Sequence, residues 1–280
     1  MIARIRTKRL ALPMLLAVFA FLAVACDRSQ ADTWVDVGGY KLGAHCEGEG
    51  SPAVILDAGG GGNSSTWRGV QPSVAEFTRV CSYDRAGLAN SEDRTDRDVD
   101  GGHVADELAR LISGLGLPPP YVLVGHSVGA IYTSLYAARH PANVDGMVFV
   151  DPTTEDQFAA FDAEWQIPHF ADEGGSHIDW TSTVEELQAA PGYGDAPVIS
   201  LDSGKIDNPI WLDLRRDLAQ RSTNSMLVVA DDSGHSIQRQ QPDVVIRSIK
   251  LVVDSARSNE PMPPCAPSFA DLKATCEPVR

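Results

Sequence analysis

The sequence predicts an α/β protein in which a mostly parallel central sheet is flanked by helices. Short apolar strands alternate with helix-like periodicity over residues 53–150 and again over residues 197–256. The chain has 280 residues, 43% of them hydrophobic, which is enough for one large domain with a substantial core. In addition, the strand that begins "YVLVGHSVGA" (121–130) runs directly into a helix.

Residues 1–25 have the composition of a secretion signal. Four basic residues precede an apolar run over residues 10–25, which ends in the small-residue pattern of a cleavage site. The run contains Pro13 and is shorter than the roughly 20 residues that a transmembrane helix needs. We therefore expect export from a bacterial cytoplasm to the periplasm or cell envelope.

The end of this signal leaves two possibilities open. "LAVAC" resembles a bacterial lipoprotein box, in which Cys26 carries the lipid and becomes the new N-terminus. That assignment leaves an even number of cysteines to pair outside the cytoplasm, namely Cys46, Cys81, Cys265 and Cys276. Simple cleavage before an unmodified Cys26 is the alternative. A lipid on Cys26 would be the protein's only contact with a membrane.

The predicted elements follow in order as one domain over residues 26–280. A hairpin of edge strands lies around Gly38 and Gly39. The expected later strands are 52–59, 78–87, 121–125, 144–151, 197–202 and 225–232, and the expected helices are 103–117, 130–140, 210–222 and 242–256. Residues 152–196 break the alternation with aromatics, acids and glycines, which predicts a cap inserted after the sixth strand. The proline-rich tail from residue 259 is expected to be irregular.

The net charge of −15 at pH 7 excludes several partners. A strongly acidic surface repels nucleic acid, so none is expected. The glycine run 59–62 lacks the motifs of a phosphate-binding loop, and the histidines show no metal-ligand spacing. We therefore expect neither a metal nor a cofactor, and a small molecule as the partner.

Ser127 is the candidate nucleophile, because it lies in Gly-x-Ser-x-Gly between a strand and a helix. The sharp turn would display its hydroxyl above the carboxyl edge of the sheet. A serine needs a base, and His235 follows a late strand just before the final helix. His126 adjoins Ser127 but is expected to point away from it and to pack.

The chain resembles α/β hydrolases almost end to end, from "VILDAGGGGNSSTW" through "RVCSYDRAGLANS" and "YVLVGHSVGA" to "SGHSIQRQQPDVV". The resemblance implies an esterase, lipase, lactonase or amidase, since dehalogenases and epoxide hydrolases need aspartate as the nucleophile. It also implies an oxyanion hole made by the backbone N–H groups of Gly60 and Val128. The family's sheet order makes its second and fourth strands neighbours, which suggests a Cys46–Cys81 disulfide. Cys265 and Cys276 would then form the second pair.

The third member of the triad remains open among three aspartates. Most members of the family carry the acid after a later strand, where Asp202 and Asp207 lie. Some relatives, including haloalkane dehalogenases, carry it at the position equivalent to Asp151. We favour Asp151, which ends the strand beside the nucleophile strand and precedes Pro152, expected to hold it extended.

These residues together predict a serine hydrolase that cleaves a carboxylic ester, amide or lactone through an acyl-enzyme. Five aromatic residues of the cap are expected to line an apolar pocket for a small or medium uncharged acyl group: Phe158, Phe161, Trp165, Phe170 and Trp180. Two alternatives use the same fold. One is a cofactor-free perhydrolase or haloperoxidase, and the other is a non-catalytic surface lipoprotein.

Overall fold

The computed structural model describes residues 33–160, 172–206 and 208–280. The predicted signal segment 1–25 and Cys26 lie outside these residues. Among the helices of the described ranges, none has the length and apolar character needed to cross a membrane.

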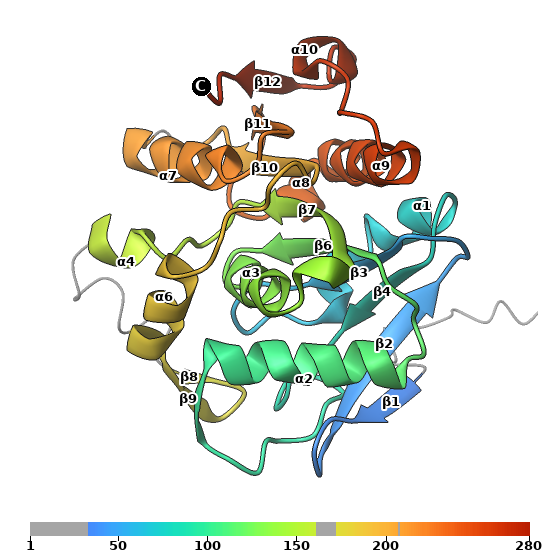
Figure 1. Ribbon diagram of the computed structural model, residues 1–280, viewed down its shortest axis with the longest axis vertical. Helices are drawn as coiled ribbons and strands as arrows, with labels where there is room; N and C mark the ends of the chain where they lie inside the picture. Colours follow the sequence, from blue (N-terminus) through green and yellow to red (C-terminus); the bar gives the residue numbers. More distant parts are fainter. Residues whose placement is uncertain (1–32, 161–171, 207) are drawn as a thin grey trace, which may run out of the picture.

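One sheet of nine strands organises the described part of the chain, in the order β1-β2-β4-β3-β6-β7-β10-β11-β12 (Figure 1). The strands from β4 to β11 pair in parallel, and the pairs β1–β2, β2–β4 and β11–β12 are antiparallel. This confirms the predicted mostly parallel sheet. The strands are β1 Thr33–Asp36, β2 Lys41–Glu47, β3 Ala53–Asp57, β4 Val80–Tyr83, β6 Tyr121–His126, β7 Val144–Val150, β10 Val198–Ser203, β11 Ser225–Ala230 and β12 Ala274–Glu277.

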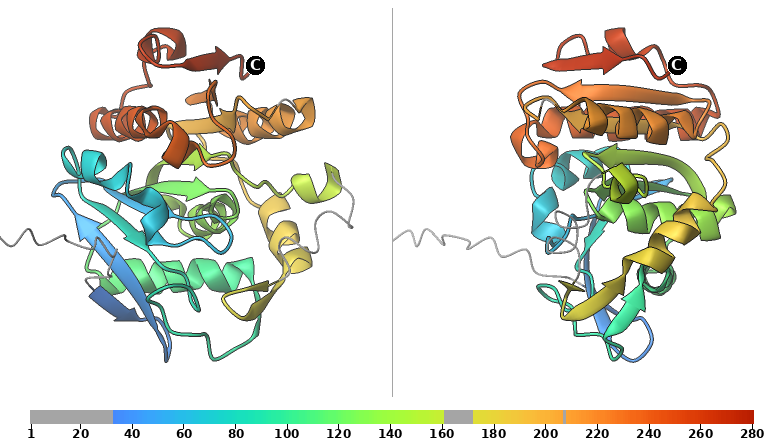
Figure 2. Two further views of the ribbon diagram at one scale, coloured as in Figure 1. Left: turned by 180° about the vertical axis from the view of Figure 1, so that it is seen from behind. Right: turned by 90° about the vertical axis from the view of Figure 1, so that its left-hand side faces the viewer.

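Helices cover both faces of this sheet (Figures 1 and 2). Side chains of α2, α3 and α7 belong to the core on one face, and those of α1 and α9 to the core on the other. The helices are α1 Gln71–Ala75, α2 Gly101–Gly114, α3 Gly129–Arg139, α4 Gln157–Ala160, α6 Trp180–Gln188, α7 Pro209–Gln220, α8 Ile237–Gln240, α9 Pro242–Ser258 and α10 Cys265–Ser268, with 3-10 turns η1 Ser64–Trp67 and η2 Pro141–Asn143.

Helix α2 illustrates how the sequence specifies these elements. Asp100 caps its first turn by accepting a hydrogen bond from the His103 N–H at 2.7 Å. Its apolar residues recur at helical spacing, so Val104, Leu108 and Leu111 are all buried against the sheet. Burial of each leucine stabilises the fold by roughly 2 kcal/mol.

Both predicted disulfides are present. Cys46 of β2 lies directly opposite Cys81 of β4 in the antiparallel register, and the two are bonded. Cys265 and Cys276 are also bonded. The prediction of an irregular tail was wrong, because residues 274–277 form β12 along the exposed edge of β11. Pairing with β11 satisfies backbone groups that would otherwise face water at the sheet edge.

The segment between β7, the sixth strand of the large sheet, and β10 contains α4 and α6 as well as a hairpin of β8 (Asp172–Glu173) and β9 (Ser176–Asp179). Residues 161–171, which include Phe161, Trp165 and Phe170, lie outside the described residues. The hairpin joins β5 (Asp98–Asp100) in a small second sheet, at the end of the molecule opposite β12 (Figure 2).

Candidate active site

Ser127 occupies the sharp turn between β6 and α3. Its φ of +51° lies in the left-handed region, which a non-glycine residue adopts only when its surroundings impose it. A Cβ on Gly125 would lie 2.6 Å from Ala130 Cα, and one on Gly129 would lie 2.6 Å from the Ala58 carbonyl oxygen. The two glycines of the motif are therefore required by close packing of the turn.

Backbone hydrogen bonds fix the turn against β7. The Ser127 N–H donates to the Val150 carbonyl at 3.1 Å, and the Ser127 carbonyl accepts from the Thr153 N–H at 3.0 Å. These two bonds flank Asp151, the residue after β7. The serine and this aspartate are thereby held on adjacent parallel strands at the carboxyl edge of the sheet.

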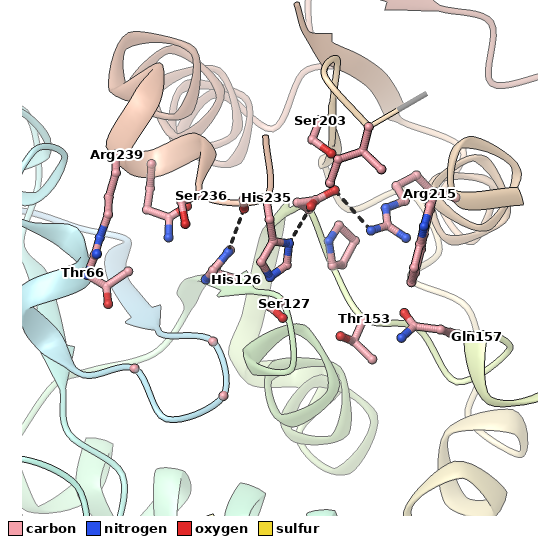
Figure 3. Close-up of a pocket in the computed structure, with 18 residues that line it drawn as sticks. Thr66, His126, Ser127, Thr153, Gln157, Ser203, Arg215, His235, Ser236 and Arg239 are labelled. Carbon is pink, nitrogen blue, oxygen red and sulfur yellow. Dashed lines mark hydrogen bonds and ion pairs between the residues drawn. The ribbon is translucent and has the colours of Figure 1, made fainter. Parts of the chain in front are cut away.

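Asp151 and His235 are hydrogen-bonded at the edge of a cavity, with His235 Nδ1 2.6 Å from Asp151 Oδ2. Asp151 is buried, and burial alone would raise its pKa. The hydrogen bond from His235 and the charge of Arg215 outweigh that effect and hold the pKa of Asp151 below its usual value. Its carboxylate is thus ionised and receives the ring N–H. Figure 3 shows the Ser127 hydroxyl beneath the His235 ring.

The backbone of Asp151 differs from the prediction. We expected Pro152 to hold it extended, but its φ is +43°. Aspartate tolerates this left-handed conformation better than most residues. The Asp151 N–H donates to the Leu201 carbonyl of β10 at 2.9 Å, and this bond helps to hold the turn.

The loop that carries His235 is anchored from several directions. Gln240 Oε1 accepts the Gly234 N–H at 2.7 Å, and Gln241 Oε1 accepts the Asp232 N–H at 2.9 Å. The His235 carbonyl accepts a hydrogen bond from His126 Nε2 at 3.0 Å. Burial, reinforced by the charge of nearby His235, lowers the pKa of His126 to about 4. His126 is therefore neutral near pH 7 and acts as a hydrogen-bond donor here.

The position of His126 corrects the prediction that it points away. Its ring lies 4.8 Å from the His235 ring, centroid to centroid, and lines the same cavity as Ser127. Figure 3 shows it beside His235. The sequence offered no signal for this contact beyond its adjacency to Ser127, because the partner is a backbone carbonyl 109 positions away.

The glycine loop, residues 58–62, passes in front of the nucleophile turn. A Cβ on Gly59 would lie 3.1 Å from the Ser127 Cβ, so this loop contacts the serine directly. A Cβ on Gly60 would lie 3.6 Å from Val128 Cγ1. Gly60 and Val128, the two residues expected to supply oxyanion-hole N–H groups, therefore lie next to each other.

A cavity of about 630 Å³ opens over Ser127. Its described lining includes Asp151 and His235, an apolar group made by Pro152, Ile206 and Trp211, and polar side chains from Thr66, Thr153, Gln157, Arg215 and Arg239 (Figure 3). This volume is in the range of small-molecule sites.

The described cap aromatics do not form this cavity, contrary to the prediction. Phe158 stacks on Trp180 with ring centroids 5.4 Å apart, and neither is among the described lining residues. Among the described lining residues, the large aromatic side chain is that of Trp211 of α7, whose ring centroid lies 4.6 Å from Arg215 Cζ. Sequence reasoning assigned no role to either residue.

The other candidate acids are in different positions. Asp202 is buried, and its Oδ1 lies 3.4 Å from Arg215 Nε, while Arg215 Nη2 bonds Asp151. Burial raises the pKa of Asp202 to about 6, although the charge of Arg215 opposes the shift. Asp207 lies outside the described residues. In the described ranges, no group of three or more His, Cys, Asp or Glu side chains is arranged to hold a metal ion.

Comparisons with known proteins identify the fold of this chain. The family model for the alpha/beta hydrolase fold matches residues 52–177, which contain the glycine loop, the Ser127 turn and Asp151. The chain therefore has the α/β-hydrolase fold. Among the curated proteins similar to this chain, the uncharacterized protein YqjL of Bacillus subtilis (strain 168) is 28% identical over 212 residues, covering 72% of this chain and 83% of the relative.

Two further proteins resemble this chain. The putative carbamate hydrolase RutD of Serratia proteamaculans (strain 568) is 33% identical over 109 residues, which cover 38% of this chain and only 40% of the relative. The malate-bound thermophilic esterase from Thermogutta terrifontis superposes with a TM-score of 0.62 at 19% identity, covering 80% of this chain and 98% of that one. The structural similarity shows a shared fold.

Proposed function

We propose that the protein is a serine hydrolase that cleaves carboxylic esters through an acyl-enzyme on Ser127. The observation that carries this proposal is the 2.6 Å hydrogen bond between His235 and the buried Asp151 carboxylate, at the edge of the cavity over Ser127. A base oriented by a buried acid beside a serine in a sharp strand–helix turn is the arrangement that serine acyl transfer requires. Amides and lactones would react by the same steps.

In the proposed reaction, Ser127 Oγ attacks the substrate carbonyl carbon while His235 Nε2 takes the hydroxyl proton. The carbonyl electron pair moves onto oxygen, and the N–H groups of Gly60 and Val128 stabilise the resulting oxyanion. Asp151 keeps the proton of neutral His235 on Nδ1 and stabilises the imidazolium that forms. Collapse of the tetrahedral intermediate expels the alcohol, which receives its proton from His235. Water activated by His235 then releases the acid and restores Ser127.

The cavity supports a substrate of small or medium size. Pro152, Ile206 and Trp211 offer an apolar surface to one part of the substrate, while Thr66 and Arg239 offer polar groups to another. The similar proteins described as an esterase and as a putative carbamate hydrolase also favour a carbonyl substrate. We therefore infer an ester whose acyl group is apolar.

Substitution of Ser127 by alanine tests the proposal. Turnover of p-nitrophenyl acetate and butyrate should fall by at least about 10³-fold, because the nucleophile is removed. Ser113→Ala on the exposed side of α2 is the matched control and should behave as wild type. Undiminished turnover by Ser127→Ala would reject the proposal.

A fluorophosphonate probe separates the alternatives. It should label Ser127 in the folded wild-type protein and not in the alanine variant. Absence of labelling in folded wild type would favour a non-catalytic protein. Product formation that depends on peroxide would instead favour a perhydrolase or haloperoxidase.

We further propose that the protein is exported and that Cys26 is lipidated. The two disulfides support an oxidising compartment. Mass spectrometry of the mature N-terminus should find a diacylglyceryl group on Cys26. Cleavage next to an unmodified cysteine would contradict lipidation, and an uncleaved N-terminus would contradict export.

A further inference from the structure

A buried guanidinium that the proposed chemistry does not use lies behind the glycine loop. The Arg85 side chain is 1% exposed and follows β4. Its Nη1 contacts the Asp57 carboxylate and donates to the Ala58 carbonyl at 2.5 Å. Its Nη2 donates to the Gly59 carbonyl at 2.7 Å. Three consecutive residues of the chain are therefore bonded to a single cation.

The contact with Gly59 bears directly on the proposed oxyanion hole. The Gly59 carbonyl and the Gly60 N–H belong to the same peptide group, and in a trans peptide they point in opposite directions. The bond from Arg85 fixes the plane of that group, and so directs the Gly60 N–H away from Arg85. A cationic donor on the carbonyl also polarises the peptide and strengthens its N–H as a donor.

The other half of this arrangement comes from the cap segment. Glu173 of β8 accepts hydrogen bonds from Arg85 Nε at 2.9 Å and from Arg85 Nη2 at 2.6 Å. Its Oε1 also accepts the Gly61 N–H at 3.2 Å, and its Oε2 accepts the Tyr132 hydroxyl at 3.3 Å. The peptide groups before and after Gly60 are thus both held, one by Arg85 and the other by Glu173.

Close backbone packing places Glu173 at this point. A Cβ on Gly174 would lie 2.0 Å from the Ala86 carbonyl oxygen, and one on Gly87 would lie 2.1 Å from the Gly174 carbonyl oxygen. The residues next to Glu173 and Arg85 therefore touch through their main chains. The β8–β9 hairpin can dock in this way only where both positions lack side chains.

We propose that Glu173 and Arg85 are positioning residues through which the β8–β9 hairpin of the cap segment holds the Gly60 N–H in the oxyanion hole. This inference rests on the proposed function, because the N–H matters only if an oxyanion forms. The inference assigns the hairpin a part in rate acceleration. Loss of Glu173 should act on the transition state more than on substrate binding.

The first test is Glu173→Gln, which keeps the shape but removes the charge and one acceptor. We expect kcat for p-nitrophenyl butyrate to fall about 10- to 100-fold while KM changes less than about 3-fold, since a lost oxyanion donor costs about 10²- to 10³-fold. Affinity for a trifluoromethyl ketone, which forms an oxyanion on Ser127, should fall in proportion.

Glu186→Gln is the matched control. Glu186 of α6 also ties the cap segment to the core, by hydrogen bonds from Arg139 Nε at 2.6 Å and Arg139 Nη2 at 2.8 Å. Among the described contacts it makes none with the glycine loop. This variant should keep wild-type kcat and ketone affinity.

Amide hydrogen exchange gives a readout that needs no activity. Exchange of the Gly61 and Gly62 amides should be at least about 10-fold faster in Glu173→Gln and unchanged in Glu186→Gln. Tyr132→Phe removes one bond to Glu173 but keeps the ring beside Arg85, so it is a milder variant whose kcat should fall about 2- to 3-fold.

Wild-type kcat and ketone affinity in Glu173→Gln would overturn the inference, with or without faster exchange. If the fluorophosphonate fails to label wild type, the proposed function fails. In that case, amide exchange in Glu173→Gln and Glu186→Gln still tests whether Glu173 holds the glycine loop. Unchanged exchange in Glu173→Gln would show that it does not.

Discussion

Two buried arginines flank the candidate site, and each lies between two carboxylates. Arg85 lies between Asp57 and Glu173 behind the glycine loop, with its side chain 1% exposed. Arg215 lies between Asp151 and Asp202 behind His235, with its side chain 3% exposed. The two clusters therefore contain the same charges at similar burial, yet they are bonded very differently.

The two guanidinium groups differ in how many of their nitrogens donate hydrogen bonds. Every nitrogen of Arg85 donates to a carboxylate or a carbonyl. Among the described residues, Arg215 donates one hydrogen bond, from Nη2 to Asp151 Oδ1 at 3.1 Å, and its Nε and Nη1 have no hydrogen-bond partner. We call the Arg85 cluster closed, because all of its guanidinium nitrogens are hydrogen-bonded. We call the Arg215 cluster open, because some of its guanidinium nitrogens are not.

This contrast matches the demands of the proposed chemistry. Oxyanion donors act best when they do not move during the reaction, so a fully bonded scaffold suits the glycine loop. The His235 ring must gain and lose a positive charge next to Asp151. A strongly bonded Arg215 would compete for that carboxylate, whereas a loosely bonded one that shares its charge with Asp202 opposes the imidazolium less.

Replacing each arginine by methionine tests the difference between the two clusters. Arg85→Met leaves two buried carboxylates without their cation, and we expect it to lower the free energy of unfolding by about 3–5 kcal/mol. Arg215→Met should cost less, about 2–3 kcal/mol, because fewer bonds are lost and Asp151 keeps His235 as a partner. Urea denaturation at pH 7 measures both values.

Arg139→Met is the control for these two variants. Arg139 also joins two carboxylates, those of Asp106 and Glu186, but its side chain is 30% exposed. Solvent screens such pairs, so the loss should stay within about 1 kcal/mol. If Arg85→Met and Arg215→Met lowered the free energy of unfolding equally, the distinction between a closed and an open cluster would be wrong.

The sequence predicted what depends on local pattern. The alternation of strands and helices is set by hydrophobic periodicity, which each segment carries by itself. The Ser127 turn was also predictable, because the glycines at 125 and 129 are needed wherever a strand turns sharply into a helix. The placement of His235 followed from its position after a late strand.

The polar clusters could not be predicted in the same way. Arg85 and Glu173 are 88 positions apart, and Glu173 lies in a segment without clear periodicity. Their pairing depends on how the β8–β9 hairpin docks, which no local pattern specifies. The same holds for Arg215, whose partner Asp151 is 64 positions away. The strand β12 was missed because prolines precede it and its pairing with an edge strand is a tertiary event.

A smaller expected effect concerns Asp202 in the Arg215 cluster, which should make the free energy of unfolding depend on pH. Burial raises the pKa of Asp202 to about 6, from an ordinary value of 3.8. The folded protein therefore holds this proton more tightly than the unfolded chain does. Asp202 consequently favours folding below about pH 4 relative to neutral pH, and this contribution is lost as the pH rises from about 4 to about 6.

Asp202→Asn abolishes this titration and leaves the other carboxylates in place. The free energy of unfolding of the variant minus that of wild type should therefore increase by on the order of 2 kcal/mol between pH 4 and pH 6.5. Urea denaturation across that range measures the difference, and taking the difference cancels the carboxylates common to both proteins. A flat line for Asp202→Asn would mean that Arg215 compensates the buried charge fully, and the Arg215 cluster would then be as closed as that of Arg85.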